Sequence, residues 1–434
     1  MNRLFPGGIH PAGHKEISSY SDSAPLVSPT RVVIPLRQHI GAPCRPLVAV
    51  GDRVAMGQPI GDGEDLCVPV HSSISGRVTA IGDAPYPTGG TVSAVTIDND
   101  HEERWFDELC PHPAPEELDR EGLFTLMRTM GLVGMGGAAF PTHAKAASSA
   151  GKIDTLLING CECEPYITAD DFLLRTRPRQ VLDGIRLLAR ALRPARTVLA
   201  LEDNKPRAIA ALREHPDRFP GLELRVLPTR YPQGGEKQLI QAVTGREVTP
   251  GKLPADLGCA VFNVSTAAAL SQAVYDGLPL IRRIVTVTGE GVRRPGNFLV
   301  PIGTSFAQVI RAAGGLAEGA LRVVAGGPMM GVAQPGLEVP VIKSTNCILC
   351  LPGEGPEERP RCIRCGKCLD ACPVHLQPLY LYRYELAGDL KALERLNLTD
   401  CMECGCCSYV CPGKLPLVER FRAGKRALKE GKST

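Results

Sequence analysis

Two cysteine strings near the end of the chain carry the strongest chemical signal. Each has the form Cys-x2-Cys-x2-Cys-x3-Cys-Pro, and they occupy residues 362–373 and 401–412. This spacing is typical of paired [4Fe-4S] clusters, because short gaps let three thiolates wrap one cluster while the fourth reaches the other. We predict two clusters, with these ligands: Cys362, Cys365, Cys368 and Cys411 for one, and Cys401, Cys404, Cys407 and Cys372 for the other.

Zinc is the alternative occupant of these strings, since it often binds Cys-x2-Cys pairs, but two identical four-cysteine strings favour iron-sulfur clusters. Cys406 lies inside the second string, out of register, and is predicted to pack near the cluster. Cys347 and Cys350 form one more such pair, without a second pair at zinc spacing. We interpret these two as packing cysteines, and metal binding by them stays an open alternative.

A glycine-rich segment at residues 131–145 is the second candidate site. Its glycines Gly134, Gly136 and Gly137 would let backbone amides approach a phosphate or a ring, and Lys145 offers a positive charge to a phosphate. A glycine-rich segment is often only a turn, and this one does not have the spacing of the dinucleotide-binding fingerprint. The segment alone therefore does not establish a ligand site, and the residues that follow it in the chain must support this interpretation.

An amide and two acids follow the next predicted strand. The apolar run at 153–158 predicts that strand, and Asn159, Glu162 and Glu164 come directly after it. Ligands of α/β folds bind at the carboxyl ends of the strands, which is where these side chains would lie. Two acids in a solvated surface loop are the alternative interpretation.

The elements that must position these residues alternate between strands and helices. This alternation predicts a mostly parallel α/β sheet. Strands are predicted at 153–158, 197–201 and 222–227, and helices at 180–192, 205–214 and 236–243. A small unit of sheet and helix is predicted from residue 284, with its helix at 305–313.

Residues 30–100 alternate short apolar runs with glycine and proline, which predicts a small all-β module. Its pattern around Gly51, Gly57 and Gly76 resembles the barrel-sandwich of lipoyl and biotinyl carrier domains. Those domains carry a lysine at a hairpin tip, but residues 63–70 contain none. We therefore expect a structural or docking role for this module. The polar, proline-rich residues 101–122 that follow it are predicted to be a linker.

The composition narrows the class of protein. The 434 residues are 44% hydrophobic and 22% charged, with a formal net charge of +3, which is typical of a globular protein of several domains. Aromatic residues make up 5% of the chain, so we expect no nucleic-acid partner. No apolar stretch is long enough to cross a membrane, and Pro6 interrupts the start, so we expect a soluble cytoplasmic protein.

The glycine-rich segment and the acids after it resemble the FMN- and NADH-binding subunit of respiratory complex I. The likeness to the C subunits of Rnf electron-transport complexes is closer still and covers nearly the whole chain in order. The matching motifs are Phe5-Pro-Gly7-Gly8-Ile-His10-Pro11, Gln38-His39-Ile40-Gly41-Ala42-Pro43, Met135-Gly-Gly-Ala-Ala-Phe-Pro-Thr-His143-x-Lys145, Asn159-Gly160-x-Glu162-Cys163-Glu164-Pro165-Tyr166 and Gly326-Gly327-Pro328-Met329-Met330-Gly331.

This resemblance implies a multidomain α/β plus β fold with four domains. They are a barrel-sandwich hybrid at 1–112, a Rossmann-like FMN/NADH domain at 113–281, an SLBB β-grasp domain at 282–343 and a helical, ferredoxin-like domain with two clusters at 344–434.

The resemblance also implies the residues of a flavin and nicotinamide pocket. It assigns cofactor binding to Gly134, Gly136, Gly137, Lys145, Asn159, Asn263 and Thr266, and a catalytic role on the nicotinamide side to Glu162, Glu164 and Glu236. The chain departs from the complex I pattern at Cys161, where an acid is expected, and lacks the arginine between the first glycines.

In function, the resemblance implies a peripheral subunit of a membrane-bound ferredoxin:NAD+ oxidoreductase coupled to ion translocation, at the cytoplasmic face of the inner membrane. Its cofactors would be FMN, NAD(H) and two [4Fe-4S] clusters. Its partners would be membrane-embedded and ferredoxin-like subunits of the complex, with ferredoxin acting indirectly. Two alternatives remain: a soluble flavoprotein similar to cobalamin reductases, and an electron-relay subunit without flavin.

Overall fold

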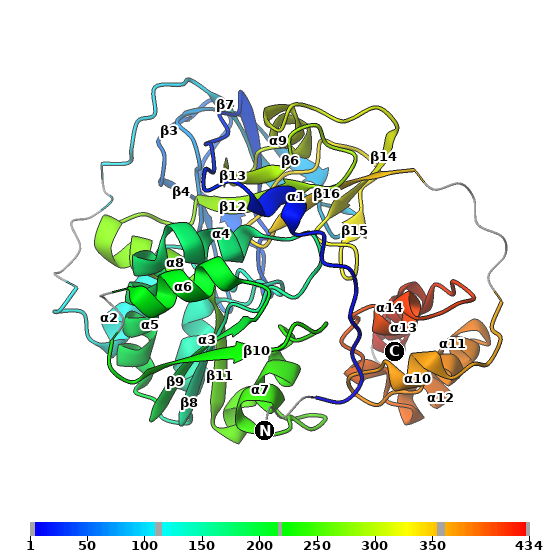
Figure 1. The fold of residues 1–434 in the computed structure, drawn as a ribbon. Helices are drawn as coiled ribbons and strands as arrows, with labels where there is room; N and C mark the ends of the chain where they lie inside the picture. The colour runs from blue at the N-terminus through cyan, green and yellow to red at the C-terminus, as the bar shows by residue number, and fades with distance from the viewer. Residues whose placement is uncertain (1–4, 108, 110–114, 216–218, 354–360, 431–434) are drawn as a thin grey trace.

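Strands and mixed α/β structure occupy the described chain up to residue 353, and helices occupy the rest. The computed structural model describes residues 5–107, 109, 115–215, 219–353 and 361–430. In Figure 1 the β-rich parts lie above the α/β part, and the C-terminal helices form a separate group beside them. The multidomain α/β plus β class predicted from the sequence is confirmed.

The first unit is a pair of small antiparallel sheets. Strand β1 alternates exposed and buried residues, and its inward side chains Val32 and Ile34 pack with Ile60, Val95 and Ile97 in a fully buried core. One sheet has the order β1-β7-β6-β3: Arg31–Pro35, Thr91–Asn99, Gly76–Pro85 and Arg53–Val54. The other has the order β2-β4-β5: Arg45–Pro46, Pro59–Asp62 and Val70–His71.

The second unit is a parallel sheet with the order β10-β9-β8-β11. Its strands are β8 (Thr155–Asn159), β9 (Arg196–Glu202), β10 (Leu222–Leu227) and β11 (Cys259–Asn263). Its helices are α2 (Arg120–Thr129), α3 (Thr142–Ser149), α4 (Ala169–Thr176), α5 (Pro178–Leu192), α6 (Pro206–Glu214), α7 (Glu236–Thr244) and α8 (Val264–Ser271), with a 3-10 turn at Pro254–Leu257 and a π turn at Gln272–Asp276. Three strands and three helices therefore lie within a few residues of their predicted positions, whereas β11 was not predicted.

Helix α5 is held against α8 at a point that only glycine allows. A Cβ atom on Gly184 would lie 1.8 Å from the backbone oxygen of Ala267. The buried face of α5 consists of Val181, Ile185 and Leu188, the apolar positions at helical spacing. The close approach fixes α8, whose first residues lie at the candidate site.

The third unit is a five-stranded sheet with the order β13-β12-β16-β14-β15. Its elements are β12 (Arg282–Thr288), β13 (Gly296–Pro301), α9 (Phe306–Ala312), β14 (Ala320–Ala325), β15 (Val332–Ala333) and β16 (Cys347–Pro352). We assigned residues from 344 onward to the cluster domain, but β16 pairs with β12 and β14, so this strand belongs to the third unit. Cys347 and Cys350 are therefore buried inside this sheet.

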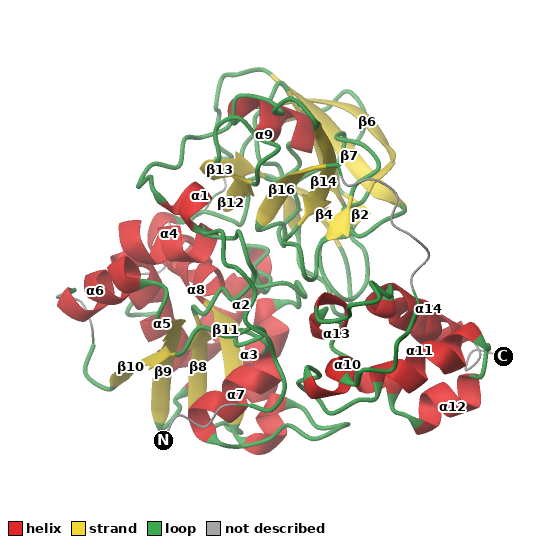
Figure 2. Ribbon diagram, turned by 45° about the vertical axis from the view of Figure 1, so that its right-hand side comes forward, coloured by secondary structure: helices red, strands yellow, loops and turns green. Residues whose placement is uncertain are grey.

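The last unit consists of short helices around the two cysteine strings. They are α10 (Lys367–Asp370), α11 (Pro378–Leu386), α12 (Leu390–Arg395), α13 (Cys406–Tyr409) and α14 (Leu417–Glu430), with a 3-10 turn at Leu398–Asp400. The helical spacer predicted between the strings is present as α11 and α12. Figure 2 shows these helices grouped on the side of the molecule away from β10. Within the described residues, no helix is both long and apolar enough to span a membrane.

The N-terminal segment joins the α/β unit to the helical unit (Figure 1). The backbone nitrogen of Ile9 donates a hydrogen bond to the oxygen of Tyr231 at 2.8 Å, and a residue earlier Gly8 donates to Ala371 at 3.0 Å. Gly7 has a φ of +63°, and a Cβ there would lie 2.5 Å from the oxygen of Cys372. The glycines of this segment therefore allow it to pass between the two units.

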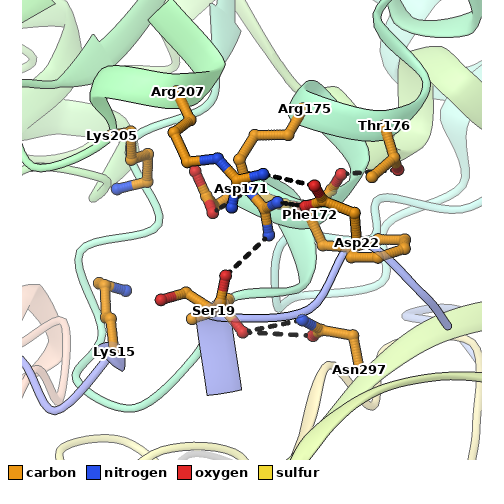
Figure 3. A network of polar contacts seen from close by, with 12 residues as sticks. Lys15, Ser19, Asp22, Asp171, Phe172, Arg175, Thr176, Lys205, Arg207 and Asn297 are labelled. Atoms are coloured by element: carbon orange, nitrogen blue, oxygen red, sulfur yellow. Dashed lines mark hydrogen bonds and ion pairs between the residues drawn. The ribbon is translucent and has the colours of Figure 1, made fainter. Parts of the chain in front are cut away.

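A polar network fastens the continuation of this segment, including α1 (Glu16–Ser19), to α4 (Figure 3). The nearly buried side chain of Arg175 pairs with Asp171 at 2.8 Å and also with Asp22. Arg207 pairs with Asp22 as well, and Arg175 donates to the oxygen of Ser19 at 3.4 Å. The buried pair with Asp171 holds the Arg175 guanidinium in place on α4, and from there it bonds to Asp22 and Ser19 of the segment.

Candidate functional site

The candidate site lies at the carboxyl ends of β8 and β11. These neighbouring strands end at Asn159 and Asn263, which are direct partners in the sheet register. From β8 the chain continues to β9 and β10 on one side, and β11 lies on the other side, so the strand order reverses between β8 and β11. In open α/β sheets, ligands bind at this reversal point.

The glycine-rich loop lies directly over this point. The backbone nitrogen of Met135 donates to Oγ1 of Thr266 at 2.9 Å, which fastens the loop to the first turn of α8. A Cβ on Gly136 would lie 3.2 Å from Cβ of Asn263, tighter than most real contacts. Gly136 and Gly137 are exposed, and Gly137 has a φ of +144°. Their backbone is therefore open to a ligand above the strand ends.

Helix α3 begins just after this loop. Its N-cap residue Pro141 provides no side-chain cap, and the hydroxyl of Thr142, 1% exposed, has no hydrogen-bond partner among the described residues. One turn further on, Lys145 forms an ion pair with Glu236 at 2.5 Å. An uncapped helix start with a buried hydroxyl and a lysine nearby has the donor set that binds a phosphate.

The loop after β10 closes another side of the site. The amide nitrogen of Asn159 donates to the oxygen of Gly234 at 2.8 Å, while its amide oxygen accepts from the nitrogen of Cys161 at 3.1 Å. The side chain of Gln233 is fully buried, and neither of its amide atoms has a partner among the described residues. Gln233 was not among the predicted site residues, because its burial without partners depends on the surrounding fold and no local pattern marks it.

Glu162 acts on the start of α4. Its carboxylate accepts hydrogen bonds from the backbone nitrogens of Asp170 at 2.7 Å and Asp171 at 3.2 Å. Asp170 in turn accepts from the amide of Asn263 at 2.7 Å and the hydroxyl of Ser265 at 2.6 Å. Burial raises the pKa of Glu162, and the nearby Lys15 opposes this rise. Glu162 therefore helps to position the residues beneath the glycine-rich loop.

This arrangement predicts the behaviour of two substitutions at Glu162. Glu162→Ala removes both acceptors at the start of α4 and is expected to cost about 1–2 kcal/mol, by analogy with the loss of a helix cap. Glu162→Gln keeps one acceptor oxygen and is expected to cost less. Apparent melting temperatures measured anaerobically for both variants will check this order, and equal melting temperatures for alanine and wild type would contradict it.

Glu164 contacts a different part of the molecule. Its carboxylate accepts from the backbone nitrogens of Met329 at 2.7 Å and Met330 at 3.1 Å, in the turn after β14. Burial raises the pKa of Glu164, and the two amides oppose this rise. Glu164 thus fastens the third unit to the loop after β8. Glu162 and Glu164 are each only partly buried as residues, although their carboxylates are engaged by backbone amides.

A group of buried charges that sequence analysis missed supports the same loop. Lys15 donates to the main-chain oxygens of Glu162 at 2.8 Å and Glu164 at 3.0 Å. Lys205 and Glu202 have almost no exposure and lie 3.6 Å apart, and Lys205 also donates to the oxygen of Cys161. No local pattern marked these residues, because Lys15 is 147 positions from Glu162.

The cysteines group as the spacing predicts. A cavity in the helical unit is lined by Cys372 of the first string together with Cys401, Cys404 and Cys407 of the second, and by the unassigned Cys406. On the other side, burial raises the pKa of the Cys368 thiol, and Cys411 and Cys365 raise it further because they lie nearby. Cys372 therefore lies with three cysteines of the second string, and Cys411 lies near two of the first, as the predicted exchange of fourth ligands requires.

The two groups differ in exposure. Cys404 and Cys407 are buried, whereas Cys362 and Cys365 are exposed. Backbone nitrogens donate to the sulfur atoms of three predicted ligands, namely Leu376 to Cys372 at 3.3 Å, Arg364 to Cys362 at 3.4 Å and Glu403 to Cys401 at 3.4 Å. Such N–H···S bonds stabilise metal-bound thiolates and tune the potentials of clusters.

Tyr231 connects the candidate site at the strand ends to the more buried of the two cysteine groups. We call this the inner group; it comprises Cys372, Cys401, Cys404 and Cys407. It is 2% exposed, and its hydroxyl donates to the backbone oxygen of Cys404 at 2.7 Å. Cys163, in the loop after β8, packs in the same apolar cluster as Cys404 and Cys406. The buried cysteine group thus lies directly against the loops of the candidate ligand site.

Together, fold and site define a protein with an FMN-type α/β domain and a two-cluster, ferredoxin-like domain in one chain. Four family matches agree with this class. They are the RnfC barrel sandwich hybrid domain at 3–102, the Nuo51 FMN-binding domain at 127–272, the SLBB domain at 284–333 and the 4Fe-4S dicluster domain at 361–414.

The chain belongs to the family of C subunits of ion-translocating oxidoreductase complexes. It is 41% identical to the C subunit of the Na+-translocating ferredoxin:NAD+ oxidoreductase complex of Acetobacterium woodii, over 98% of this chain and 97% of that one. It is 48% identical to the C subunit of the ion-translocating oxidoreductase complex of Pseudomonas aeruginosa and 45% identical to that of Klebsiella pneumoniae, over 98% and 97% of this chain. It spans only 56% of the length of either of these two relatives.

A solved structure shares the fold. A chain of the NAD+-reducing [NiFe]-hydrogenase in the H2-reduced state matches with a TM-score of 0.51 at 22% identity, over 75% of this chain and 64% of that one. At this identity the likeness shows the fold alone, and the chemistry must be argued from the residues themselves.

Proposed function

We propose that this chain is the NAD(H)- and FMN-binding electron-transfer subunit of a ferredoxin:NAD+ oxidoreductase complex coupled to ion translocation. The observation that carries the proposal is the direct contact between the strand-end site and the buried cysteine group through Tyr231. When bound, FMN takes up two electrons as a hydride from NADH and passes them on singly, as [4Fe-4S] clusters require. The name of the Acetobacterium relative agrees with this reaction.

The residues at the strand ends fit a flavin mononucleotide. The exposed backbone of Gly136 and Gly137 offers amides to the ring or the phosphate. Glycine is needed there, because a side chain would crowd Asn263 at position 136 and strain the backbone at position 137. The unpartnered hydroxyl of Thr142 and the uncapped start of α3 would hold the phosphate. Lys145, which is paired with Glu236, would add a positive charge near the phosphate. Asn159, Asn263 and Thr266 would keep the loop and the strand ends in place.

The cysteine groups fit two [4Fe-4S] clusters. In this proposal, Cys401, Cys404, Cys407 and Cys372 hold the inner cluster, and Cys362, Cys365, Cys368 and Cys411 hold the outer one. The grouping of thiols across the two strings and the N–H···S bonds support it. Electrons would leave the flavin through the inner cluster and reach the surface at the outer one, because Cys362 and Cys365 are exposed.

The exposure of the outer cysteine group suggests which partners exchange electrons with the chain and where the chain binds. We infer that membrane-embedded subunits and a ferredoxin-like subunit of the complex exchange electrons with the outer cluster, and that the chain binds peripherally at the cytoplasmic face of the inner membrane. The relatives named as complex subunits support partner subunits of this kind. The same names, over 97% or more of this chain, favour this function over a soluble flavoprotein similar to cobalamin reductases.

Titration of the purified chain with NADH tests the proposal. After anaerobic reconstitution of the clusters and identification of the bound flavin by chromatography, NADH is added while optical and EPR spectra are recorded. Bleaching of FMN followed by signals of reduced [4Fe-4S] clusters is the expected result. Clusters that stay oxidised in a chain that binds no flavin would overturn the proposal in favour of a flavin-free relay.

Glu164 gives a sharper prediction within this function. Glu164→Ala leaves the amides of Met329 and Met330 without their acceptor. The turn after β14 is then no longer fixed to the loop after β8, on the side of the site where we expect the nicotinamide. We expect NADH-dependent flavin reduction to fall by about tenfold or more while FMN stays bound. Stopped-flow bleaching of the flavin will measure this rate. Glu164→Gln, which keeps one acceptor oxygen, should lose less, and an unchanged rate in the alanine variant would remove Glu164 from this side of the site.

A further inference from the structure

Three metal-ligating side chains meet inside the first unit, away from the proposed flavin and cluster sites. His39, Cys44 and Cys67 are 4%, 6% and 0% exposed. The sulfur atoms of the two cysteines lie 3.4 Å apart, and Nε2 of His39 lies 3.7 Å from the sulfur of Cys67. One ligand atom from each residue lies within 4.8 Å of the others. Within the described residues, the two thiols are free.

Two of the three separations are close to those in a tetrahedral zinc site, and the third is at most 4.8 Å. Zinc-sulfur bonds of about 2.3 Å and zinc-nitrogen bonds of about 2.0 Å at tetrahedral angles place two sulfur atoms about 3.8 Å apart, and a sulfur and a nitrogen about 3.5 Å apart. The observed separations of 3.4 Å and 3.7 Å lie within about 0.4 Å of these values. An ion could therefore be held after small movements of the three side chains, in which Nε2 of His39 exchanges its hydrogen bond from Val68 for the ion.

The imidazole of His39 is oriented as a metal ligand usually is. Its Nδ1 lies 3.2 Å from the backbone oxygen of Ile40, to which it can donate. Its Nε2 accepts from the backbone nitrogen of Val68 at 3.2 Å, so Nε2 is the unprotonated nitrogen, on the side of the cysteines, and a bound ion would replace this hydrogen bond. Burial lowers the pKa of His39 and so favours the neutral ring. A ring nitrogen that donates to a carbonyl while the other binds the ion is the common arrangement at metal sites.

A buried lysine lies near the two cysteines. Lys343 is fully buried, and its Nζ donates to the backbone oxygens of Pro69 at 2.9 Å and Gly131 at 2.7 Å. Burial raises the pKa of the Cys44 thiol to about 12, while the Lys343 charge lowers it and Asp62 raises it. A bound cation would displace the thiol protons, and its positive charge would stabilise the two thiolates in their buried surroundings.

We propose that His39, Cys44 and Cys67 bind one thiolate-preferring divalent cation of the zinc type, with water as the fourth ligand. The ion would join the loop after β1, which carries His39 and Cys44, to the segment before β5, which carries Cys67. The first of these loops touches the glycine-rich loop, because Ile40 donates its backbone N–H to the oxygen of Ala139 at 3.2 Å. The ion would thus link two segments of the first unit beside the candidate flavin pocket.

The metal content of the full chain, with its iron-sulfur clusters assembled, tests the proposal. The protein is supplied with zinc, washed with a chelator and analysed for zinc and iron together, so that empty cluster cysteines are not counted. The expected result is about one zinc per chain, with X-ray absorption showing two sulfur ligands at about 2.3 Å and a nitrogen at about 2.0 Å. Absence of zinc from iron-loaded wild type would overturn the proposal.

Two variants separate this site from the others. Cys67→Ser should lose the zinc, whereas Cys259→Ser, a matched change at another buried free cysteine, should keep it. Equal zinc in both variants would identify an adventitious ion and overturn the proposal. So would a Cys44–Cys67 disulfide in the purified chain, detected as an intact mass lowered by two hydrogens. If Cys67→Ser does not fold, the ligand set seen by X-ray absorption in wild type decides the question alone.

Discussion

Cys372→Ser is expected to damage the cluster held by the second cysteine string, not the one held by its own. The test uses a chain in which Cys362, Cys365 and Cys368 are all serine, so that only the second cluster assembles, with about four irons. In this background, Cys372→Ser should lower the iron to about three or fewer and produce the EPR signal of a [3Fe-4S] cluster. The reason is that Cys372 lines the cavity shared with Cys404 and Cys407.

Cys411→Ser in the same background is the matched control. It removes the last cysteine of the second string itself, yet it should leave the iron content at about four, because Cys411 lies near Cys368 and Cys365 of the other group. The reverse result, with loss of iron in Cys411→Ser and none in Cys372→Ser, would show that each string holds its own cluster. Iron analysis and EPR of both variants give a direct answer.

The cysteine strings could be predicted because their chemistry depends on local spacing. Residues two or three positions apart in a tight turn must lie near each other, whatever the rest of the chain does. The same holds for strands and helices with strong apolar periodicity, such as β10 and α5. Local patterns therefore identified the two cysteine groups, three strands of the parallel sheet and three of its helices, α5, α6 and α7.

The strands that were misjudged depend on distant partners. Strand β11 is a short, continuously buried run that leads directly into α8, so its residues could not be told from the start of the helix, although its end carries Asn263. Strand β16 lies close to the cysteine strings in sequence but pairs with β12, which is some sixty positions earlier in the chain. Sheet pairing of this kind is decided by tertiary packing, which a single sequence does not display.

The residues of the candidate site were largely named from the sequence, but the contacts that they make were predicted only in part. Glu162 and Glu164 were expected to face a nicotinamide, and the structure shows their carboxylates bonded to backbone amides of α4 and of the turn after β14. Lys15 and Gln233 were not predicted at all, because each matters only through its three-dimensional surroundings. Acids that fix neighbouring backbone can still shape a pocket, and the Glu164 variants measure that contribution.

Gly136→Val is expected to abolish flavin binding while leaving the clusters intact. A Cβ at this position already lies 3.2 Å from Cβ of Asn263, and the γ carbons of valine would extend over the exposed backbone that the flavin must approach. Asn263 cannot move away freely, because its side chain caps α8 and bonds to Asp170. We expect FMN affinity to fall at least about 100-fold, or about 2.7 kcal/mol.

Fluorescence titration of the flavin-free chain with FMN measures this loss, and iron content shows whether the helical unit still assembles. Gly336→Val is the matched control, since Gly336 is exposed and a Cβ there has no neighbour within 4 Å. It should bind FMN as wild type does. If Gly136→Val also binds FMN with wild-type affinity, the flavin does not approach the strand ends of β8 and β11 through this loop, and the pocket must lie elsewhere. A selective loss would instead tie the cofactor to the point where the strand order reverses, next to the tyrosine that contacts the inner cysteine group.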